Sequence, residues 1–442
     1  MTKTTRRIFV LCLVLFASLA LAFQPARAQA DAPLALVMTA DGPIMPPMLE
    51  YIKRGIDVAE RRNAEVLVIQ LNTPGGSIET MLEIIRAIRA SNVPVVVYVA
   101  PKNAIAGSAG AMITMAGHVS AMAPETSIGA SSPISSSGEN LTTTAEAKAK
   151  EITKASIRPL VTRRGEEALA LAEAMIDEAK AATADEALKV NLIDFVADDL
   201  EDLLQALDGF TIQMNDGPRT LNTSNVETVP LNMSFIEQFL LLLTDPNIAF
   251  LLLAIGVQSV LIEISSPGGW VAGFIGVVCL TLAVYGMGVL PVNWFGIIFL
   301  LTAFVLFILD IKAPTHGALT TAGVASFIIG ALVLFNSPGV PQFQRVSVPL
   351  VVATGVVIGL LFMVMLMYAL RALKVPIRAG VESLIGKMGI ARTAVEGAGG
   401  QVQLGSELWS AESADASEFI GKGDRVEVVE VKGLRLKVRK VK

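Results

Sequence analysis

One serine stands alone within a run of very small residues. In the stretch NAIAGSAGAMITM, residues 103–115, Ser108 lies between Gly107 and Ala109, among alanine, glycine and methionine. Such a hydroxyl fits two roles: a small residue where a helix packs tightly or begins, or a nucleophile that a substrate backbone can reach. The pattern places Ser108 after a strand and at the start of a helix, where free N–H groups and the positive dipole end gather. The N–H of Ala109 would then help to bind an oxyanion.

A second segment offers bare backbone donors. LNTPGGS, residues 71–77, ends a predicted buried strand and precedes a predicted helix. Gly75 and Gly76 let the backbone turn sharply and leave N–H groups that no side chain covers. Such groups bind a developing oxyanion or an extended peptide. An ordinary strand–helix turn is the alternative, because residues 265–269 repeat Pro-Gly-Gly in the apolar half of the chain.

A serine alcohol needs a proton acceptor to become a nucleophile. The chain has two histidines, His118 and His316. His316 lies in the apolar region, and a helix from Ser108 would place His118 about 15 Å away, so a Ser-His-Asp triad is not expected. A lysine kept neutral by burial is the remaining base. The segment AEAKAKEITKASIR offers Lys148, Lys150 and Lys154. Composition does not choose among them, and a charged helix face is the alternative for all three.

The elements that position these residues belong to an α/β domain over residues 34–210. Unalternating apolar runs predict strands that are buried on both faces, and helical patterns separate them, which favours parallel pairing. The strands are expected at 34–40, 64–72, 93–100, 118–123 and 192–197. The Ser/Thr-rich residues 131–145 predict a loop, and residues 215–232 a polar linker.

Composition excludes several functions. Hydrophobic residues make up 53% of the 442 residues and the mean hydropathy is +0.60, which indicates a membrane protein. The net charge of −5 argues against a nucleic-acid partner. Both cysteines, Cys12 and Cys279, lie in apolar runs, so no disulfide framework or cysteine metal site is expected, and the chemistry needs no metal or cofactor.

Residues 1–30 have the pattern of a secretory signal peptide. A basic head is followed by an apolar stretch from Ile8 to Phe23 and by two A-x-A signatures that end at Ala28 and Ala30. The sequence therefore predicts that the α/β domain is exported.

Five apolar segments predict a transmembrane region within residues 234–373. Each is near the roughly 20 residues that cross a bilayer. They cover about 247–262, 270–289, 294–311, 317–335 and 349–372. The apolar FIEQFLLLLTD that precedes the first is expected at the membrane interface. Five spans place the α/β domain outside and the C-terminus in the cytoplasm, and Arg371, Lys374 and Arg378 agree with the positive-inside rule.

Residues 381–442 predict a small β-barrel. DRVEVVEVKGLRLKVRKVK alternates apolar and charged residues on both sides of Lys432-Gly433, the signature of a β-hairpin. Since the basic residues alternate with valine and leucine, we interpret them as a solvated sheet face rather than an RNA-binding surface.

The motifs LNTPGGS, AGSAGAMI, HVSAMAPETSIGASSPI and TADEALKVNLIDFVA occur in this order. With DPNIAFLLLAIG, LPVNWFGIIFL, IGKMGIARTAV and GDRVEVVEVKGLRLKV, the sequence resembles the long-form nodulation-efficiency protein D (NfeD) family. These are membrane-bound ClpP-class serine proteases, also called stomatin operon partner proteases. The resemblance covers nearly the whole mature chain.

The resemblance implies a multi-domain protein: a ClpP/crotonase-like protease domain over 31–212, a linker at 213–233, the membrane region and an OB-like barrel over 381–442. It implies a Ser-Lys dyad in which Ser108 is the nucleophile, with Gly75 and Gly76 as oxyanion and substrate-strand glycines. The family spacing from the dyad lysine to a basic residue and then a glycine selects Lys148, through Arg158 and Gly165.

The expected function is a serine endopeptidase of the inner membrane that cleaves apolar or membrane-protein segments, works with a stomatin-like membrane protein and forms a homo-oligomer. The alternative is a catalytically inactive scaffold that binds peptides and a stomatin-like partner. A signal-peptide peptidase shares the dyad chemistry but typically carries an N-terminal anchor rather than five later spans and a barrel.

Overall fold

The computed structural model describes residues 33–133, 143–265, 269–313, 315, 317–337, 340–374, 381–396 and 399–441. The expected signal peptide, most of the 131–145 loop and His316 lie outside the described residues. The chain divides into two compact units. The first comprises Met1–Leu309 with Thr315–Gly359, and the second comprises Asp310–Pro314 with Leu360–Lys442.

The first unit contains a six-stranded sheet in which every neighbouring pair is parallel, as the sequence predicts. The strand order is β11-β1-β2-β3-β5-β8. The bounds are Leu34–Asp41 for β1, Val66–Asn72 for β2, Val95–Val99 for β3, Val119–Met122 for β5, Phe195–Val196 for β8 and Glu227–Pro230 for β11. The parallel sheet brings the carboxyl ends of β2 and β3 to one edge, beside which the glycine and serine segments follow.

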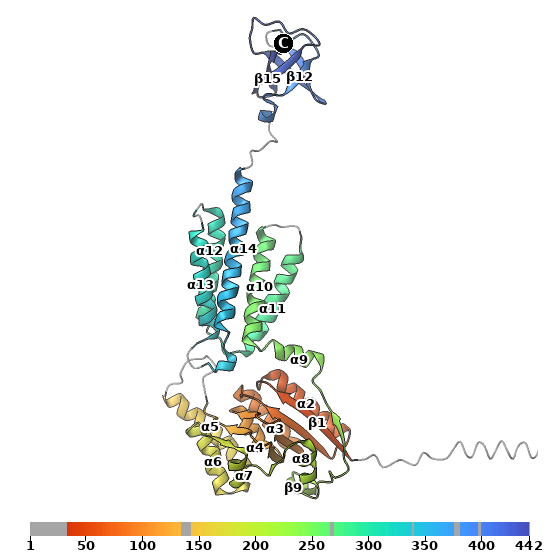
Figure 1. The fold of residues 1–442 in the computed structure, drawn as a ribbon, viewed down its shortest axis with the longest axis vertical. Helices are drawn as coiled ribbons and strands as arrows, with labels where there is room; N and C mark the ends of the chain where they lie inside the picture. The colour runs from red at the N-terminus through yellow and green to blue at the C-terminus, as the bar shows by residue number, and fades with distance from the viewer. Residues whose placement is uncertain are drawn as a thin grey trace, which may run out of the picture. The chain divides into compact units, whose positions relative to one another are not determined.

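Helices cover both faces of this sheet (Figure 1). They are α2 (Pro46–Arg61), α3 (Ile78–Ala90), α4 (Ala109–Ala116), α5 (Thr143–Val161), α6 (Glu166–Asp177), α7 (Ala184–Lys189) and α8 (Leu200–Leu207). The alternation along β2 shows the two layers: Leu67 and Ile69 belong to one core, and Val66 and Val68 to the other. All four are fully buried, which explains why the first four residues of β2 form an unbroken apolar run.

A second, three-stranded sheet carries the serine segment. β4 (Ile105–Gly107) pairs in parallel with β6 (Ser127–Gly129), which pairs antiparallel with β7 (Ala181–Thr183). Strands of three residues show no periodicity, so the sequence does not predict this sheet.

Residues 215–232 differ from the polar linker expected there. β9 (Thr211–Met214) and β10 (Gly217–Thr220) form an antiparallel hairpin, and β11 extends the large sheet beside β1. The polar residues of this segment pair through the backbone, and the side chains of β10 alternate between partly buried and exposed positions, so the polar composition does not reveal these strands.

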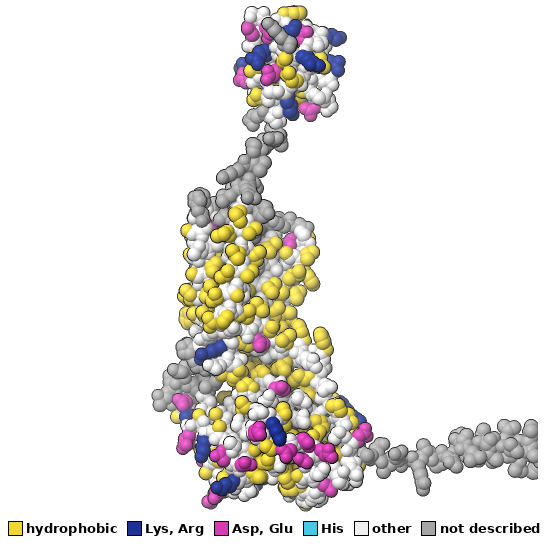
Figure 2. Space-filling view, viewed as in Figure 1, with side chains coloured by type: hydrophobic (Ala, Val, Ile, Leu, Met, Phe, Trp, Pro, Cys, Tyr) yellow, Lys and Arg dark blue, Asp and Glu magenta, His cyan; other side chains and the backbone are white. Residues whose placement is uncertain are grey.

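The apolar half of the chain forms helices where the five segments are expected. They are α10 (Pro246–Ser265), α11 (Val271–Val289), α12 (Phe295–Lys312), α13 (Ala318–Phe335) and α14 (Val348–Lys374). Hydrophobic side chains cover their surface (Figure 2). Within the described residues, four helices are long and apolar enough to cross a membrane, and the apolar run of α12, Phe295–Asp310, is shorter. The protein is a multi-pass membrane protein, and the count of five spans remains a prediction.

The second unit contains a closed five-stranded barrel, as predicted. Its order is β12-β13-β14-β16-β15, with bounds Met388–Ala391, Gly400–Leu404, Glu407–Ser413, Arg435–Lys440 and Arg425–Lys432 in that order. The predicted hairpin is confirmed, since Lys432 faces Arg435 across a turn in which Gly433 has a φ of +63°. An OB-like topology stays a prediction.

Candidate active site

Ser108 occupies a sharp turn between β4 and α4. Its backbone has φ 49° and ψ −114°, a conformation that side chains rarely adopt. Two neighbours hold it there: the Ser108 N–H donates to the Gly129 carbonyl at 3.3 Å, and the Gly107 N–H donates to the Thr73 carbonyl at 2.9 Å. The side chain does not cap α4, although Ser108 lies at the N-cap position. The N-cap alternative therefore has no support in the hydrogen bonds.

Gly75 lies directly against Ser108. A Cβ atom on Gly75, whose φ is +115°, would lie 2.6 Å from the Ser108 Cβ and 3.2 Å from its Oγ. The contact arises because residue 73 is bridged to β4: the Thr73 N–H donates to the Ile105 carbonyl at 2.7 Å. The glycine segment and the serine segment, which the sequence shows as separate motifs, thus form one site.

The backbone N–H groups of Gly75 and Gly76 differ in whether they already have a hydrogen-bond acceptor. The Gly75 N–H donates to the Thr73 Oγ1 at 3.1 Å, so it is already engaged. On one side of the glycine segment, the Ile44 N–H donates to the Gly75 carbonyl and the Ile44 carbonyl accepts the Ser77 N–H. In a parallel bridge of this kind the N–H of the intervening residue, Gly76, points to the other side. Among the described residues, neither the Gly76 N–H nor the Ala109 N–H has a hydrogen-bond acceptor.

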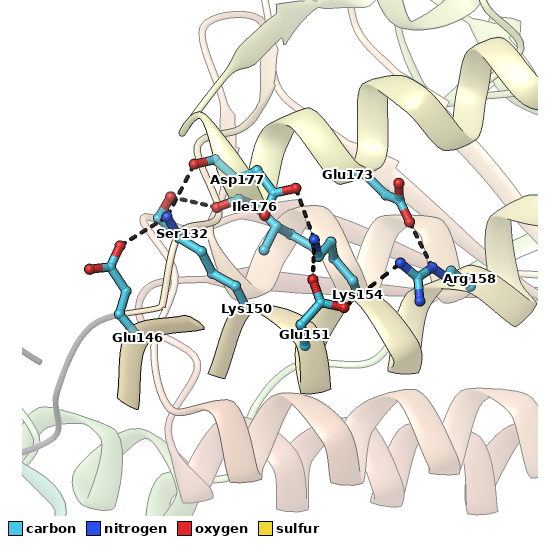
Figure 3. Close-up of polar contacts among 9 residues, drawn as sticks. All are labelled: Ser132, Glu146, Lys150, Glu151, Lys154, Arg158, Glu173, Ile176 and Asp177. Carbon is cyan, nitrogen blue, oxygen red and sulfur yellow. Dashed lines mark hydrogen bonds and ion pairs between the residues drawn. The ribbon is translucent and has the colours of Figure 1, made fainter. Parts of the chain in front are cut away.

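The three candidate lysines lie on α5 and differ in their partners. Figure 3 shows Lys150 and Lys154 with theirs. The Lys150 Nζ donates to the Asp177 carbonyl at 3.1 Å and pairs with Glu146 at 2.9 Å. The Lys154 Nζ pairs with Glu151 at 2.5 Å and with Asp177 at 3.0 Å. Hydrogen bonds from Lys154 to Glu151 first, and to Asp177 second, raise the pKa of its ammonium above the usual value. Lys154 is therefore held as a cation.

Lys148 has a different environment. It is exposed, and it makes no hydrogen bond or ion pair with another described residue. No hydrogen bond joins Lys148 to Ser108 among the described residues, and the expected dyad stays a prediction. α5 nevertheless contacts α4, and Ile157 and Val161 of α5 belong to the same core as the α4 side chains, which places the lysine helix beside the serine helix.

His118 is a structural residue. It lies just before β5, is 3% exposed, and its Nδ1 accepts the Val95 N–H at 3.1 Å. Burial first, and the nearby Arg89 and Arg163 second, lower the pKa of His118 to about 4. The imidazole is therefore neutral at physiological pH, and it belongs to the packing beneath the sheet rather than to the serine.

One buried ion pair near the site could not be predicted from the sequence. Arg164 donates to both carboxylate oxygens of Asp194 at 2.8 Å, and Asp194 also accepts the Ser120 N–H at 2.8 Å. The Arg164 side chain is 6% exposed. This pair ties the end of the lysine helix region to β5. Because the partners are distant in sequence, no local pattern could have indicated it.

A mostly apolar cavity of about 420 Å³ opens beside the glycine loop. Its lining includes Pro43, Met45, Pro74, Met233, Leu241, Leu242 and Phe343. Pro74 connects it directly to Gly75. Within the described residues, no group of three or more histidine, cysteine, aspartate or glutamate side chains is placed to hold a metal ion.

Three NfeD domain profiles match the chain in order. The N-terminal domain of NfeD1b matches residues 40–214, the NfeD integral membrane domain residues 247–368, and the NfeD-like C-terminal, partner-binding domain residues 381–440. The membrane-bound protease PH1510 of Pyrococcus horikoshii is 36% identical over 397 residues, which cover 88% of this chain and 89% of that protein. The membrane protein NfeD1b of Bacillus subtilis is 24% identical over 443 residues, 94% of each chain.

Two solved structures are also similar. The first is 1510-N, a membrane-bound stomatin-specific protease, as a lysine-to-alanine variant in complex with a substrate peptide. It is 34% identical, covers 49% of this chain and 99% of its own, and has a TM-score of 0.45. The second is the C-terminal domain of the stomatin operon partner protein 1510-C from Pyrococcus horikoshii, which is 34% identical, covers 15% of this chain and 98% of its own, and has a TM-score of 0.14.

Proposed function

Because the chain belongs to the NfeD family of membrane proteins and stomatin operon partner proteases, we propose that it is a membrane-anchored serine endopeptidase with a Ser-Lys dyad. The observation that carries this proposal is the strained backbone of Ser108, packed against Gly75. Strained backbone gathers at functional sites. A serine on a strained strand-to-helix turn presents its hydroxyl as a nucleophile elbow does.

Lys148 is the proposed base because the two other candidate lysines, Lys150 and Lys154, are paired with carboxylates. A lysine accepts a proton only as the neutral amine, and a carboxylate partner favours the ammonium. Lys150 and Lys154 both have such partners, whereas Lys148 has none among the described residues. The exposure of Lys148 implies a further condition: the bound substrate must cover the amine and remove water from it before it acts as a base.

The oxyanion donors of the proposal are the N–H groups of Gly76 and Ala109. Both lack an acceptor within the described part of the chain, and they flank the serine from the two segments that meet there. The Gly75 N–H is not a donor in this proposal because Thr73 holds it. Gly75 instead keeps space open, since a side chain here would collide with Ser108.

In the proposed reaction, the Ser108 Oγ attacks the peptide carbonyl while the Lys148 Nζ takes the hydroxyl proton. The carbonyl oxygen becomes an oxyanion, which the Gly76 and Ala109 N–H groups stabilise. The intermediate collapses, the C–N bond breaks, and Lys148 returns the proton to the leaving amine. Water then attacks the acyl ester, gives its proton to Lys148, and the collapse releases the acid and restores the Ser108 hydroxyl.

The proposed substrates are apolar peptide segments, including those of membrane proteins. An extended chain would pair with the glycine strand through its backbone. The cavity beside Pro74 would receive apolar side chains, since most of its lining is apolar. The relative PH1510 and the 1510-N structure are named for membrane-bound and stomatin-specific proteolysis, so the proposal includes a stomatin-like partner at the barrel. We further propose that the protein is a homo-oligomer. Its protease domain lies outside the inner membrane and its barrel lies in the cytoplasm.

A non-hydrolytic scaffold is the second candidate. It is favoured by the exposure of Lys148, which has no hydrogen bond or ion pair with Ser108 or with another described residue. In this alternative the glycine strand and the apolar cavity bind peptides without cleaving them. The 24% identical NfeD1b is named as a membrane protein rather than as a protease.

Labelling with a serine-directed fluorophosphonate separates the two candidates. The full chain in detergent is compared with Ser108→Ala, Lys148→Ala and two matched controls, Ser156→Ala and Lys154→Ala, both on α5. We expect labelling to disappear in Ser108→Ala and Lys148→Ala and to persist in both controls. Labelling that survives in Lys148→Ala but not in Lys154→Ala would move the base to Lys154. No labelling of the wild type, together with retained binding of an apolar peptide, would support the scaffold.

A further inference from the structure

The short helix α9, Phe235–Leu242, exposes an apolar face. We define its outer face as Phe235, Ile236 and Phe239, which are 82%, 68% and 37% exposed and do not line the cavity beside Pro74. These positions follow helical spacing, and the Phe235 and Phe239 rings stack with centroids 6.3 Å apart. The outer face carries no charge. A contiguous apolar face of this kind on a folded protein marks a surface that something covers.

An ion pair fixes the opposite side of α9 to the α/β domain. Arg54 on α2 donates from Nε and Nη2 to the two carboxylate oxygens of Glu237, at 2.7 and 2.8 Å. The Arg54 Nη2 also donates to the Asn232 carbonyl at 2.8 Å. The Glu237 side chain is 12% exposed, and its hydrogen bond with Arg54 lowers the pKa of the carboxyl, so the pair stays charged. Bidentate geometry of this kind sets orientation as well as energy.

Glu237 also determines where α9 begins. Its carboxylate accepts the Ser234 N–H at 2.7 Å, and the Ser234 Oγ accepts the Glu237 N–H at 3.3 Å, which forms a capping box. Upstream of the helix, the Tyr51 hydroxyl donates to the Leu231 carbonyl at 2.6 Å. The start and the rotation of α9 are therefore both fixed on α2, which lies beside α9 (Figure 1). Because Glu237 is on the opposite side of the helix, its ion pair with Arg54 leaves the outer face free of α2.

Chain continuity indicates what covers the outer face. Only residues 243–245 separate α9 from α10, which is long and apolar enough to cross a membrane. Asp245 caps α10, since its Oδ1 accepts the Asn247 N–H at 2.7 Å, and an aspartate cap belongs at the water boundary of the span. Three residues reach about 10 Å at most, so α9 ends within that distance of the boundary.

We propose that α9 is a membrane-interface helix. Its outer face enters the boundary between lipid headgroups and acyl chains, and the Arg54–Glu237 pair holds the α/β domain on it. Interfacial helices lie in the membrane plane with their apolar face a short distance below the headgroups. The domain is thereby held at a fixed height and orientation at the membrane surface. This inference does not depend on hydrolysis by Ser108.

The test uses spin labels on the full chain in phosphatidylcholine vesicles, in a background in which both native cysteines are replaced, Cys12→Ala and Cys279→Ala. Single cysteines replace Ile236 and Phe239 on the outer face. The matched control is Ile152 on α5, which is 64% exposed and lies outside the proposed contact. We expect oxygen, which concentrates in lipid, to collide with the Ile236 and Phe239 labels more often than a water-soluble nickel chelate does. The order should reverse at Ile152.

Two results would overturn the proposal. If the Ile236 and Phe239 labels meet the nickel chelate as often as the Ile152 label does, the outer face lies in water. If they meet neither reagent, protein covers it. A second measurement tests the ion pair: the distance distribution between labels at Phe239 and Lys53 should broaden in Glu237→Gln and stay narrow in Asp198→Asn, which removes an exposed pair with Lys102. An unchanged distribution in Glu237→Gln would remove the anchoring role.

Discussion

Gly75 is the position at which one added carbon would reach the proposed nucleophile. In Gly75→Ala the new Cβ would lie 2.6 Å from the Ser108 Cβ, and ordinary contact begins at 3.4 Å, so the two must separate by about 0.8 Å. The Thr73 hydroxyl holds the Gly75 N–H, and the Gly129 carbonyl holds the Ser108 N–H, so the displacement falls on the site itself. A shift of about 1 Å in a reacting group lowers a rate by roughly 100-fold.

The backbone contributes a second, separable cost. An alanine forced to a φ of +115° loses about 1–3 kcal/mol of folding free energy. Gly217 supplies the matched control, because its φ is +128° and a Cβ there would meet nothing within 4 Å. Gly217→Ala should therefore lower the melting temperature to a similar degree without any effect on catalysis. The contacts of the new Cβ with Ser108, and with the neighbouring Gly107 carbonyl at 3.2 Å, then distinguish the two variants.

The assay is hydrolysis of a fluorogenic apolar peptide by the detergent-solubilised full chain, with the melting temperature recorded for each variant. We expect kcat/KM to fall by about 100-fold in Gly75→Ala and to change by less than about twofold in Gly217→Ala. If Gly75→Ala retains wild-type kcat/KM while it is folded, Gly75 does not position Ser108, and the reasoning that joins the two segments into one site is refuted.

Three further predictions concern the scaffold and its orientation. Asp194→Ala should lower the free energy of unfolding by about 3 kcal/mol, because it leaves the buried Arg164 without its anion. A denaturant titration measures this loss. A loss as small as that of an exposed ion pair would contradict the argument from burial. The folded-state pKa of His118, about 4, lies below the ordinary value of 6.5. Between these two pH values the unfolded chain binds more protons than the folded chain. The free energy of unfolding therefore falls as the pH drops from 6.5 to 4. The melting temperature of His118→Phe should fall less over this range, and an equal fall would assign the pH dependence to other groups. Cysteines at Lys102 and Leu434, both exposed, should react with a membrane-impermeant maleimide from opposite sides of the membrane, and labelling of both from one side would refute the five-span topology.

The regular parts of the fold follow from local patterns. The buried strands β2 and β3 are apolar runs without period-two alternation, and the hairpin at Lys432-Gly433 alternates with period two. In each case neighbouring residues alone carry the signal. The apolar helices are predicted for the same reason. Helix α12 shows what local patterns leave open. The helix lies where the sequence predicts it, but its apolar run ends at the buried Asp310 and is shorter than those of the four other apolar helices, so the pattern does not decide whether α12 crosses the membrane.

The site itself depends on pairings that no local pattern contains. Ser108 and the two glycines are recognisable by residue type, but their contact requires residue 73 to pair with β4, a strand of three residues. The lysine choice has the same origin. Lys154 is unsuited as a base because Asp177, which lies on α6, reaches its amine. Composition alone leaves three equivalent lysines. The contacts of Lys150 and Lys154 with Asp177 distinguish these two from Lys148, which the family spacing also selects.

The backbone of Ser108 has a consequence for evolution and engineering. Glycine adopts a φ of 49° with ψ of −114° far more cheaply than serine does, so the hydroxyl is kept there against a standing energetic disadvantage. A Ser108→Gly protein should therefore melt at a higher temperature than its parent while it cleaves nothing. A lineage released from the need to cleave would gain robustness by drifting to glycine at this one turn.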